Sequence, residues 1–145
     1  MRGLIQRVSS ASVCVDGQCH ARIEQGILLL LGIEAADGNE QSEKLIKKVL
    51  NYRIFADAEG RMNHSLKDIN GELLVVSQFT LVADTKKGLR PGFSKAAAPQ
   101  DAERCYEDFV SRLKAQHAAV ASGVFGADMQ VSLCNDGPVT FLLET

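Results

Sequence analysis

The stretch LIQRVSSASVCVDGQCHARIE, residues 4–24, decides how the fold begins, because apolar and polar residues alternate through it on both sides of Asp16-Gly17. Alternation with a period of two turns one face of a β-strand toward a core and the other toward solvent. Asp-Gly between two such runs is a strong signal for a two-residue hairpin turn. The sequence therefore predicts a hairpin of two half-buried strands at the start of the chain.

Two apolar runs further along the chain predict further strands. The run ILLLLGIE, residues 27–34, follows the break at Gly26 and shows no alternation, which is typical of a strand covered on both faces. The run ELLVVSQFTLVA, residues 72–83, comes after the Asn70-Gly71 turn signal and is strongly strand-like. We expect both runs to be strands of the sheet that the hairpin begins.

The hydrophobic period changes to that of a helix in two places. Apolar residues at helical spacing predict a helix over about residues 40–52, with Asp37 and Glu40 as a D-x-x-E start signal. A second predicted helix begins after Pro99, carries an apolar stripe that we assign to the core, and ends near Ser122-Gly123. Each helix therefore has one face to pack against the sheet.

The end of the chain combines two alternating runs with a turn signal. ADMQVSLC, residues 127–134, and VTFLLET, residues 139–145, predict two strands. Between them, NDGP, residues 135–138, is turn chemistry and predicts a corner that joins the strands. The sequence alone does not determine whether the Gly137-Pro138 bond is cis or trans.

Many strands with only two helices predict a mixed α/β fold: a largely antiparallel or mixed, barrel-like β-sheet with both helices packed on one face. The 145 residues are most simply one domain, 1–145. Two helices cannot cover the whole of an amphipathic sheet, and pairing of two subunits would cover the apolar surface that remains. We therefore expect a homodimer.

Composition limits the classes of function and the compartment. No apolar run reaches the roughly 20 residues needed to cross a bilayer, and no export signal is present, so we expect a cytoplasmic protein without membrane contact. A net charge of −2 argues against tight, non-specific binding of nucleic acid. Two local basic clusters, one over residues 44–48 and one over residues 86–90, leave weak contact with a polyanion open.

The cysteines and histidines do not form a metal-binding or nucleophilic motif. Cys14, Cys19 and His20 form the one cluster that resembles a metal site, and a second pair of ligands at suitable spacing is missing. We interpret these cysteines as small strand residues and expect neither a metal nor a cofactor. His64 and His117, like His20, are interpreted as structural residues and not as catalytic bases.

Two polar segments remain as candidate sites. Ser77-Gln78-Phe79-Thr80 follows the apolar run at residues 73–76, so its backbone N–H groups lie where a buried strand emerges and could form an oxyanion hole. The alternative is an ordinary polar strand end with Phe79 in the core. The segment NDGPVT, residues 135–140, is the second candidate, and it also reads locally as a simple corner.

Three separated motifs carry a resemblance to a known family. MRGLIQRVSSASV at residues 1–13, VVSQFTLVADTKKGLRPGF at residues 75–93 and FGADMQVSLCNDGPVTF at residues 125–141 closely resemble D-aminoacyl-tRNA deacylases of the bacterial and eukaryotic type. YRIFAD at residues 52–57 is a further agreement. The resemblance implies a homodimer that hydrolyses the ester between a D-amino acid and tRNA and also removes glycine misattached to alanine tRNA.

The resemblance also implies roles for individual residues. Gly137 and Pro138 match a Gly-Pro pair that is cis in the family and inserts into the partner subunit's pocket. The opposite wall of that pocket would be formed by Ser77, Gln78, Phe79 and Thr80. Arg7 would brace the Gly-Pro loop, and Met129 would line the site.

The chemistry of such a site needs no catalytic triad. An aminoacyl ester beside a ribose hydroxyl is already activated, so positioned water and N–H groups near Phe79 and Thr80 could supply much of the rate. Thr80 could instead be a nucleophile, but no motif residue is an evident base for it, so we favour a positioning role. Rigid carbonyls of Gly137 and Pro138 would exclude an L side chain and could not exclude glycine.

Lys86, Lys87 and Arg90 are the candidate phosphate contacts for the RNA. Two other classes of function remain open from the residues alone. One is a dimeric binding module that uses the same two polar segments for a ligand, and the other is a thiol or metal protein that uses Cys14, Cys19 and His20.

Overall fold

The computed structural model describes residues 1–86 and 88–145. Its elements, in chain order, are β1 (Arg2–Val15), β2 (Gln18–Ile23), β3 (Gly26–Gly32), α1 (Asn39–Asn51), β4 (Phe55–Ala56), β5 (Met62–His64), β6 (Glu72–Ser77), the 3₁₀ helix η1 (Phe79–Val82), α2 (Pro99–Gln116), β7 (Val120–Ser122) and β8 (Met129–Glu144). The larger sheet has the order β2-β1-β3-β6-β7, with β8 paired to β1, and β4 and β5 form a separate small sheet.

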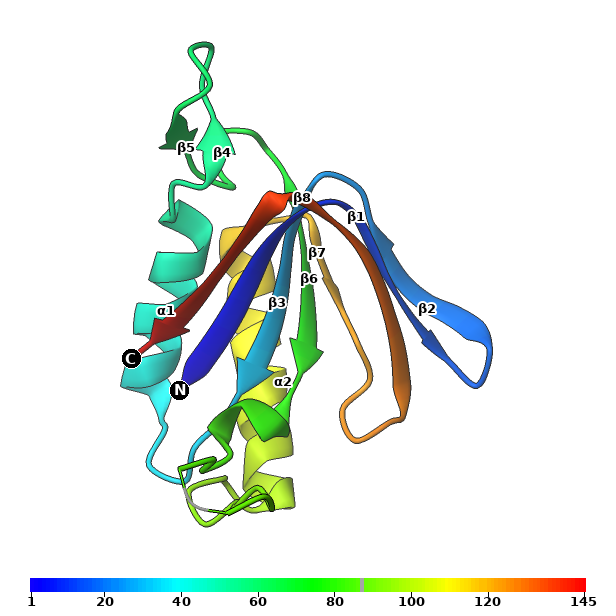
Figure 1. Ribbon diagram of the computed structural model, residues 1–145, viewed down its shortest axis with the longest axis vertical. Helices are drawn as coiled ribbons and strands as arrows, with labels where there is room; N and C mark the ends of the chain where they lie inside the picture. The colour runs from blue at the N-terminus through cyan, green and yellow to red at the C-terminus, as the bar shows by residue number, and fades with distance from the viewer. Residues whose placement is uncertain (87) are drawn as a thin grey trace.

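Strand β1 is the centre of the sheet, because it pairs antiparallel with β2, β3 and β8. The predicted hairpin is confirmed: β1 and β2 are joined by Asp16 and Gly17, with φ of 49° and 75°. Positive φ at both turn positions is the geometry that matches the twist of paired strands, and Asp-Gly adopts it readily. Figure 1 shows β1 and β8 running side by side and bending together over the top of the molecule.

The remaining pairings make the sheet mixed, as predicted. β3 pairs parallel with β6, and β6 pairs parallel with β7. The lack of alternation in the β3 run has a clear cause, because both faces of this strand are buried. Ile27 and Leu29 lie in the core cluster under the helices, whereas Leu28 lies in a second cluster with Val8 and Val76 on the inner face of the curled sheet.

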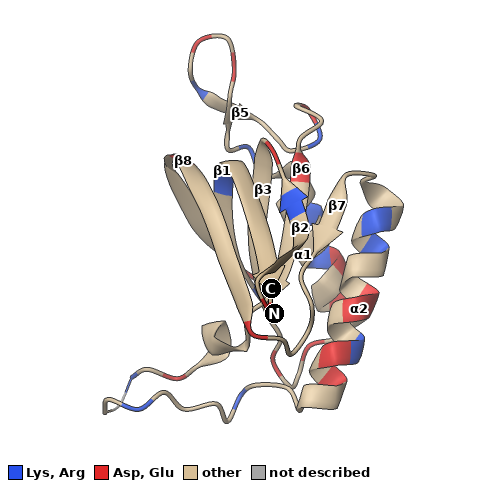
Figure 2. Cartoon of the chain, turned by 90° about the vertical axis from the view of Figure 1, so that its right-hand side faces the viewer, with Lys and Arg blue, Asp and Glu red and all other residues tan. Residues whose placement is uncertain are grey.

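Both helices cover the same face of the sheet, as Figures 1 and 2 show. Helix α1 at residues 39–51 lies within one residue of its predicted span, and its buried residues are Ser42, Leu45, Ile46, Val49 and Leu50. A Cβ atom added to Gly3 of β1 would lie 2.9 Å from Leu29 Cδ1 and 3.2 Å from Leu45 Cδ1. Glycine at this position therefore allows α1 to pack closely on β1.

The second helix ends earlier than predicted. α2 stops at Gln116, and His117 has extended backbone dihedrals while its Nε2 lies 2.7 Å from the Gly71 carbonyl oxygen. The residues that follow form β7 at positions 120–122, which pairs with β6. The predicted end near Ser122-Gly123 is therefore wrong, because pairing with the open edge of β6 takes this segment out of the helix.

Two strand predictions also need correction. The run at residues 72–83 is a strand only as far as Ser77, and it then turns into η1. The two predicted strands of the tail are one strand, β8, because the segments on both sides of NDGP pair with β1. Gln6 lies opposite Thr140 and Val8 opposite Asn135, so residues 136–139 bulge out of the ladder opposite Arg7.

The start of the chain is held by a buried ion pair. The N-terminal ammonium of Met1 lies 2.5 Å from Asp37 Oδ1, and the two side chains are 0% and 4% exposed. The other carboxylate oxygen of Asp37 accepts a hydrogen bond from the Glu34 N–H at 2.7 Å. Asp37 therefore joins the first residue of the chain to the loop before α1, instead of acting as the helix start signal that the D-x-x-E pattern predicted, because the N-cap of α1 is Gly38.

We expect Asp37→Asn to lower the free energy of unfolding by about 3 kcal/mol, because the substitution leaves a buried ammonium without a countercharge. Urea unfolding at neutral pH measures the change. Asp101→Asn is the matched control, because it removes an exposed Asp from an ion pair with Arg104 on the surface of α2. Equal, small effects of the two substitutions would contradict the role assigned to Asp37.

Candidate active site

A pocket of about 450 Å³ opens where β3 and β6 end. It is lined by Leu31, Ile33, Val76, Ser77, Gln78, Phe79, Ala96, Ala97, Pro99, Ala102, Phe125, Gly126, Ala127, Met129 and Val131. None of these side chains is ionisable. The pocket is therefore a largely apolar space in which the available polar groups are the side chains of Ser77 and Gln78 and the backbone nearby.

The segment Ser77-Gln78-Phe79-Thr80 forms one wall because the strand ladder stops there. The N–H of Gln78 still bonds to the Leu31 carbonyl oxygen at 2.7 Å, after which the chain turns into η1. The first N–H groups of a helix have no partner within it. Within the described residues, the N–H groups of Phe79 and Thr80 donate to no protein acceptor, so both can bind an external oxygen.

Side chains hold this turn in place. Gln78 Nε2 donates to Thr80 Oγ1 at 2.5 Å, which orients the threonine hydroxyl. Phe79 packs against Phe93 with ring centroids 5.1 Å apart, and it is 62% exposed. The alternative interpretation that placed Phe79 in the core is therefore wrong, and its ring stands at the mouth of the pocket.

Gly137 and Pro138 lie in the bulge of β8, and both are exposed. The bond between them is cis, and Gly137 has a φ of 139°. Asn135 closes the base of the bulge, because its Oδ1 accepts from the Val139 N–H at 2.7 Å and its Nδ2 donates to Thr140 Oγ1 at 3.0 Å. The bulge is therefore a braced projection and not a loose turn.

Arg7 adds a second brace from β1. Its Nε donates to the Asp136 carbonyl oxygen at 2.9 Å, and its Nη1 donates to the Ile54 carbonyl oxygen at 2.6 Å. The Asp136 carboxylate lies 3.3 Å from the same Nε. The Arg7 side chain is only 14% exposed, so a nearly buried guanidinium ties the bulge to the segment after α1.

The predicted site residues thus fall into two groups. Ser77, Gln78, Phe79 and Met129 line the pocket, with Thr80 next to them. Arg7, Gly137 and Pro138 form the second group, and none of these three lines the pocket of its own chain.

Sequence reasoning missed two contributors to these groups. Asn135 was interpreted only as turn chemistry, although an Asn at the base of a turn is a typical acceptor for a nearby N–H. Phe93, which supports Phe79, carried no local signal, because the contact forms between two segments that only the fold brings together.

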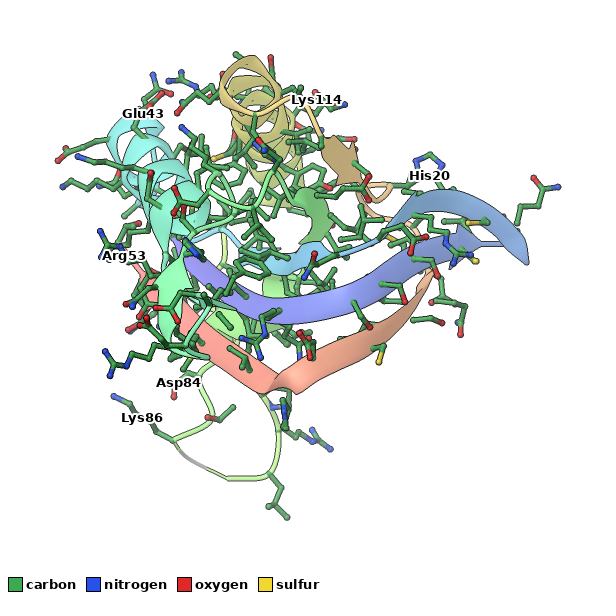
Figure 3. The ribbon with its side chains drawn as sticks, turned by 90° about the horizontal axis from the view of Figure 1, so that it is seen from above. His20, Glu43, Arg53, Asp84, Lys86 and Lys114 are labelled. Atoms are coloured by element: carbon green, nitrogen blue, oxygen red, sulfur yellow. The ribbon has the colours of Figure 1, made fainter. Side chains whose placement is uncertain are left out.

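The predicted RNA contacts lie on a projecting loop. Lys86 and Arg90 are exposed, and the Lys86 N–H bonds to Asp84 Oδ1 at 2.9 Å. Figure 3 shows Lys86 and Asp84 close together on this loop, which extends away from the sheet. Lys87 lies outside the described residues.

The cysteine and histidine cluster does not assemble as a site. Cys14 and Cys19 face each other across the hairpin as free thiols, and burial raises the pKa of Cys14, which disfavours the thiolate. His20 points away from the sheet in Figure 3. Within residues 1–86 and 88–145, no group of three potential metal ligands is found.

The described residues contain no helix that is both long and apolar enough to span a bilayer.

Comparisons with known proteins agree with the resemblance. A family model described as D-Tyr-tRNA(Tyr) deacylase matches residues 4–144. The chain is 61% identical to the D-aminoacyl-tRNA deacylases of Cellvibrio japonicus and Pseudoalteromonas translucida, over 99% of this chain and 99% of each relative.

Solved structures agree as well. A structure titled c-Myc DNA Unwinding Element Binding Protein matches with a TM-score of 0.96 and 40% identity, over 100% of this chain and 99% of that one. A probable eukaryotic D-amino acid tRNA deacylase shares the fold, with a TM-score of 0.84 at 17% identity, over 99% of this chain and 98% of that one. The match across nearly the whole sequence shows that the chain belongs to the D-Tyr-tRNA(Tyr) deacylase family, a family of hydrolases.

Proposed function

We propose that the chain, as a single deacylase domain over residues 1–145, hydrolyses the ester bond of D-aminoacyl-tRNA and releases the free D-amino acid and tRNA in the cytoplasm. The names of its relatives and the family match support this activity. One observation carries the proposal. At the apolar pocket, whose lining has no ionisable side chain, the N–H groups of Phe79 and Thr80 donate to no acceptor among the described residues.

That arrangement suits the hydrolysis of an activated ester. When water attacks the ester carbonyl carbon, negative charge develops on the carbonyl oxygen, and two N–H groups at fixed positions stabilise it. Their effect is larger in an apolar pocket than in water, because the local dielectric is lower. The vicinal ribose hydroxyl of the substrate helps to activate the water, so the protein needs neither a strong base nor a cofactor.

Gly137 and Pro138 serve as the chiral filter in this proposal. Their exposed, braced backbone does not line the pocket of its own chain, and we propose that it acts on the pocket of a partner subunit in a homodimer. Backbone carbonyls placed there hold the substrate's amino group and fill the space that an L side chain would enter. A D side chain points away from them, so its identity matters little.

Glycine has no side chain for this filter to reject. The same site therefore accepts glycyl-tRNA, including glycine misattached to alanine tRNA, and the RNA must supply further discrimination. Lys86, Lys87 and Arg90 are proposed as phosphate contacts for the RNA, and the first and last of these are exposed. Met129 lines the pocket and is proposed to contact the substrate as an apolar side chain.

Deacylation assays with D-tyrosyl-tRNA, L-tyrosyl-tRNA and glycyl-tRNA test the proposed function. We expect catalytic amounts of protein to release D-tyrosine and glycine and to leave L-tyrosyl-tRNA intact, with no change after EDTA treatment. Light scattering at micromolar concentration should report a dimer. Tight binding of D-tyrosyl-tRNA without turnover would instead favour a dimeric binding module.

Thr80→Ala should slow single-turnover deacylation about tenfold, because the hydroxyl oriented by Gln78 positions the substrate and does not attack it. Rapid-quench measurements at saturating enzyme give the rate, and Thr80→Ser is the control that retains the hydroxyl. Complete loss of turnover in Thr80→Ala, with tRNA binding intact, would show that the hydroxyl is the nucleophile.

Gly137→Ala should lower the ratio of kcat/KM for D- over L-tyrosyl-tRNA at least tenfold, about 1.4 kcal/mol in discrimination. A Cβ at this position would lie 2.6 Å from Val139 Cγ2 and 3.1 Å from Arg7 Nη2, so the bulge must shift. Gly60→Ala is the matched control, because Gly60 has a φ of 79° with nothing within 4 Å of an added Cβ. An unchanged ratio in Gly137→Ala would place the chiral filter elsewhere.

A further inference from the structure

One face of helix α1 carries an exposed basic stripe. Lys44, Lys47, Lys48 and Asn51 are spaced three and four residues apart, so they share one side of the helix. The opposite face, which includes Leu45 and Leu50, is fully buried in the core. The backbone that carries the stripe is therefore held on a rigid support.

These residues border a groove of about 390 Å³. Its lining is Lys44, Lys47, Lys48, Asn51, Tyr52 and Thr145. The Tyr52 ring packs edge-on against Phe141, with centroids 5.3 Å apart, and remains 37% exposed. The groove thus combines a partly exposed aromatic ring with three lysine side chains, each of which has an aliphatic stem and an ammonium group. This combination suits a flat base flanked by phosphates.

The positive charge of the groove is only partly compensated. Lys44 forms an ion pair with Glu40 at 2.6 Å. Lys48 donates to the backbone carbonyl oxygen of Glu144 at 2.6 Å, which leaves its charge without a carboxylate partner. Among the described residues, no carboxylate lies within 4.0 Å of the Lys47 ammonium. In a chain with a net charge of −2, such a concentration of lysines favours a polyanion.

The groove is connected to the Gly-Pro bulge and not to the pocket. Tyr52 is followed within two residues by Ile54, whose carbonyl oxygen binds Arg7, and Arg7 binds the Asp136 carbonyl oxygen. No residue lines both the groove and the pocket. In Figure 1, α1 lies beside β8, whereas β6, whose last residues line the pocket, lies further along the sheet.

We propose that this groove of α1 is a binding site for the RNA of the substrate, with Lys44, Lys47 and Lys48 on phosphates and Tyr52 stacked on a base. The proposal rests on the proposed function. In the proposed function, the Gly-Pro bulge acts on the partner's pocket. The groove is tied to that bulge through Arg7, so it binds the RNA whose 3′ end lies in the partner's pocket. One tRNA therefore contacts both subunits, with its 3′ end in one pocket and its backbone on the α1 helix of the other subunit.

The first test replaces Lys44, Lys47 and Lys48 with Gln and measures the Kd of an unacylated tRNA between about 50 and 200 mM salt. We expect the Kd to rise at least tenfold. The slope of log affinity against log salt concentration should become shallower by roughly 2, since each lost phosphate contact removes about 0.7–0.9 from it. The matched control replaces Arg22, Lys67 and Lys114, which are exposed outside α1, with Gln and should change the slope much less. Equal effects in both variants would show that tRNA responds only to the total charge of the protein, and the groove would then not be a specific binding site.

The second test separates stacking from charge. Tyr52→Leu should weaken tRNA binding roughly tenfold and leave the salt slope unchanged, because stacking on a base releases no counterions. Unchanged tRNA affinity in both Tyr52→Leu and the triple lysine variant would overturn the proposal. A protein partner would then be the remaining candidate ligand for the groove.

A short substrate distinguishes failure of this inference from failure of the proposed function. The ester of a D-amino acid with adenosine fills the pocket but has no RNA backbone to reach the groove. Wild type and the triple lysine variant should hydrolyse it at equal rates. If wild type does not hydrolyse it, the proposed function is wrong. If both hydrolyse it and tRNA affinity is unchanged, only the groove assignment is wrong.

Mixed dimers test which subunit supplies the groove. Ala127 lines the pocket, so Ala127→Trp should fill the pocket and give an inactive homodimer. A dimer in which this blocked subunit keeps its lysines and the active subunit carries the triple lysine substitution should deacylate D-tyrosyl-tRNA at the wild-type rate per open pocket, which is about half the wild-type rate per dimer. The reverse dimer, with the lysines removed from the blocked subunit, should be at least tenfold slower at low tRNA concentration. The opposite order of rates would place the groove and the pocket on the same subunit.

Discussion

The pairing of β1 along both of its edges is the constraint on which the rest of the structure depends. Its first half lies between β3 and β8, and its second half lies between β2 and β8. Since one strand serves three partners, it bends, and the sheet curls around it. The outer face receives both helices, and the inner face closes over a second core cluster.

This curled sheet determines where chemistry can take place. The parallel pair β3 and β6 ends at Leu31 and Ser77, and the polar segment that follows emerges at the edge of an apolar space. Backbone N–H groups released from the ladder at that point are fixed in position by the strands behind them. A site of this kind works by orientation and by stabilising developing charge, which explains why the usual catalytic side chains are missing from the pocket lining.

The pocket could be predicted in part from the sequence, because Ser77 to Thr80 follow an apolar strand and polar residues at such a position are exposed. The exposure of Phe79 could not, since its partner Phe93 is brought to it by the loop after η1. The brace on Gly137 was suggested only by resemblance. Arg7 reaches Asp136 because β1 and β8 pair with a bulge at that point, and no local pattern encodes a contact over this separation.

The sequence by itself determined the elements whose signals are local: the Asp16-Gly17 hairpin, the doubly buried strand after Gly26, the span of α1 and the membership of the family. The tertiary structure alone decided where longer runs stop. The run at residues 72–83 bends into η1 after the ladder to β3 ends, and the segment before Ser122 leaves the helix to pair with β6. NDGP became a bulge within one strand because β1 is long enough to pair on both sides of it, and hydrogen bonding between distant segments outweighs local turn preference.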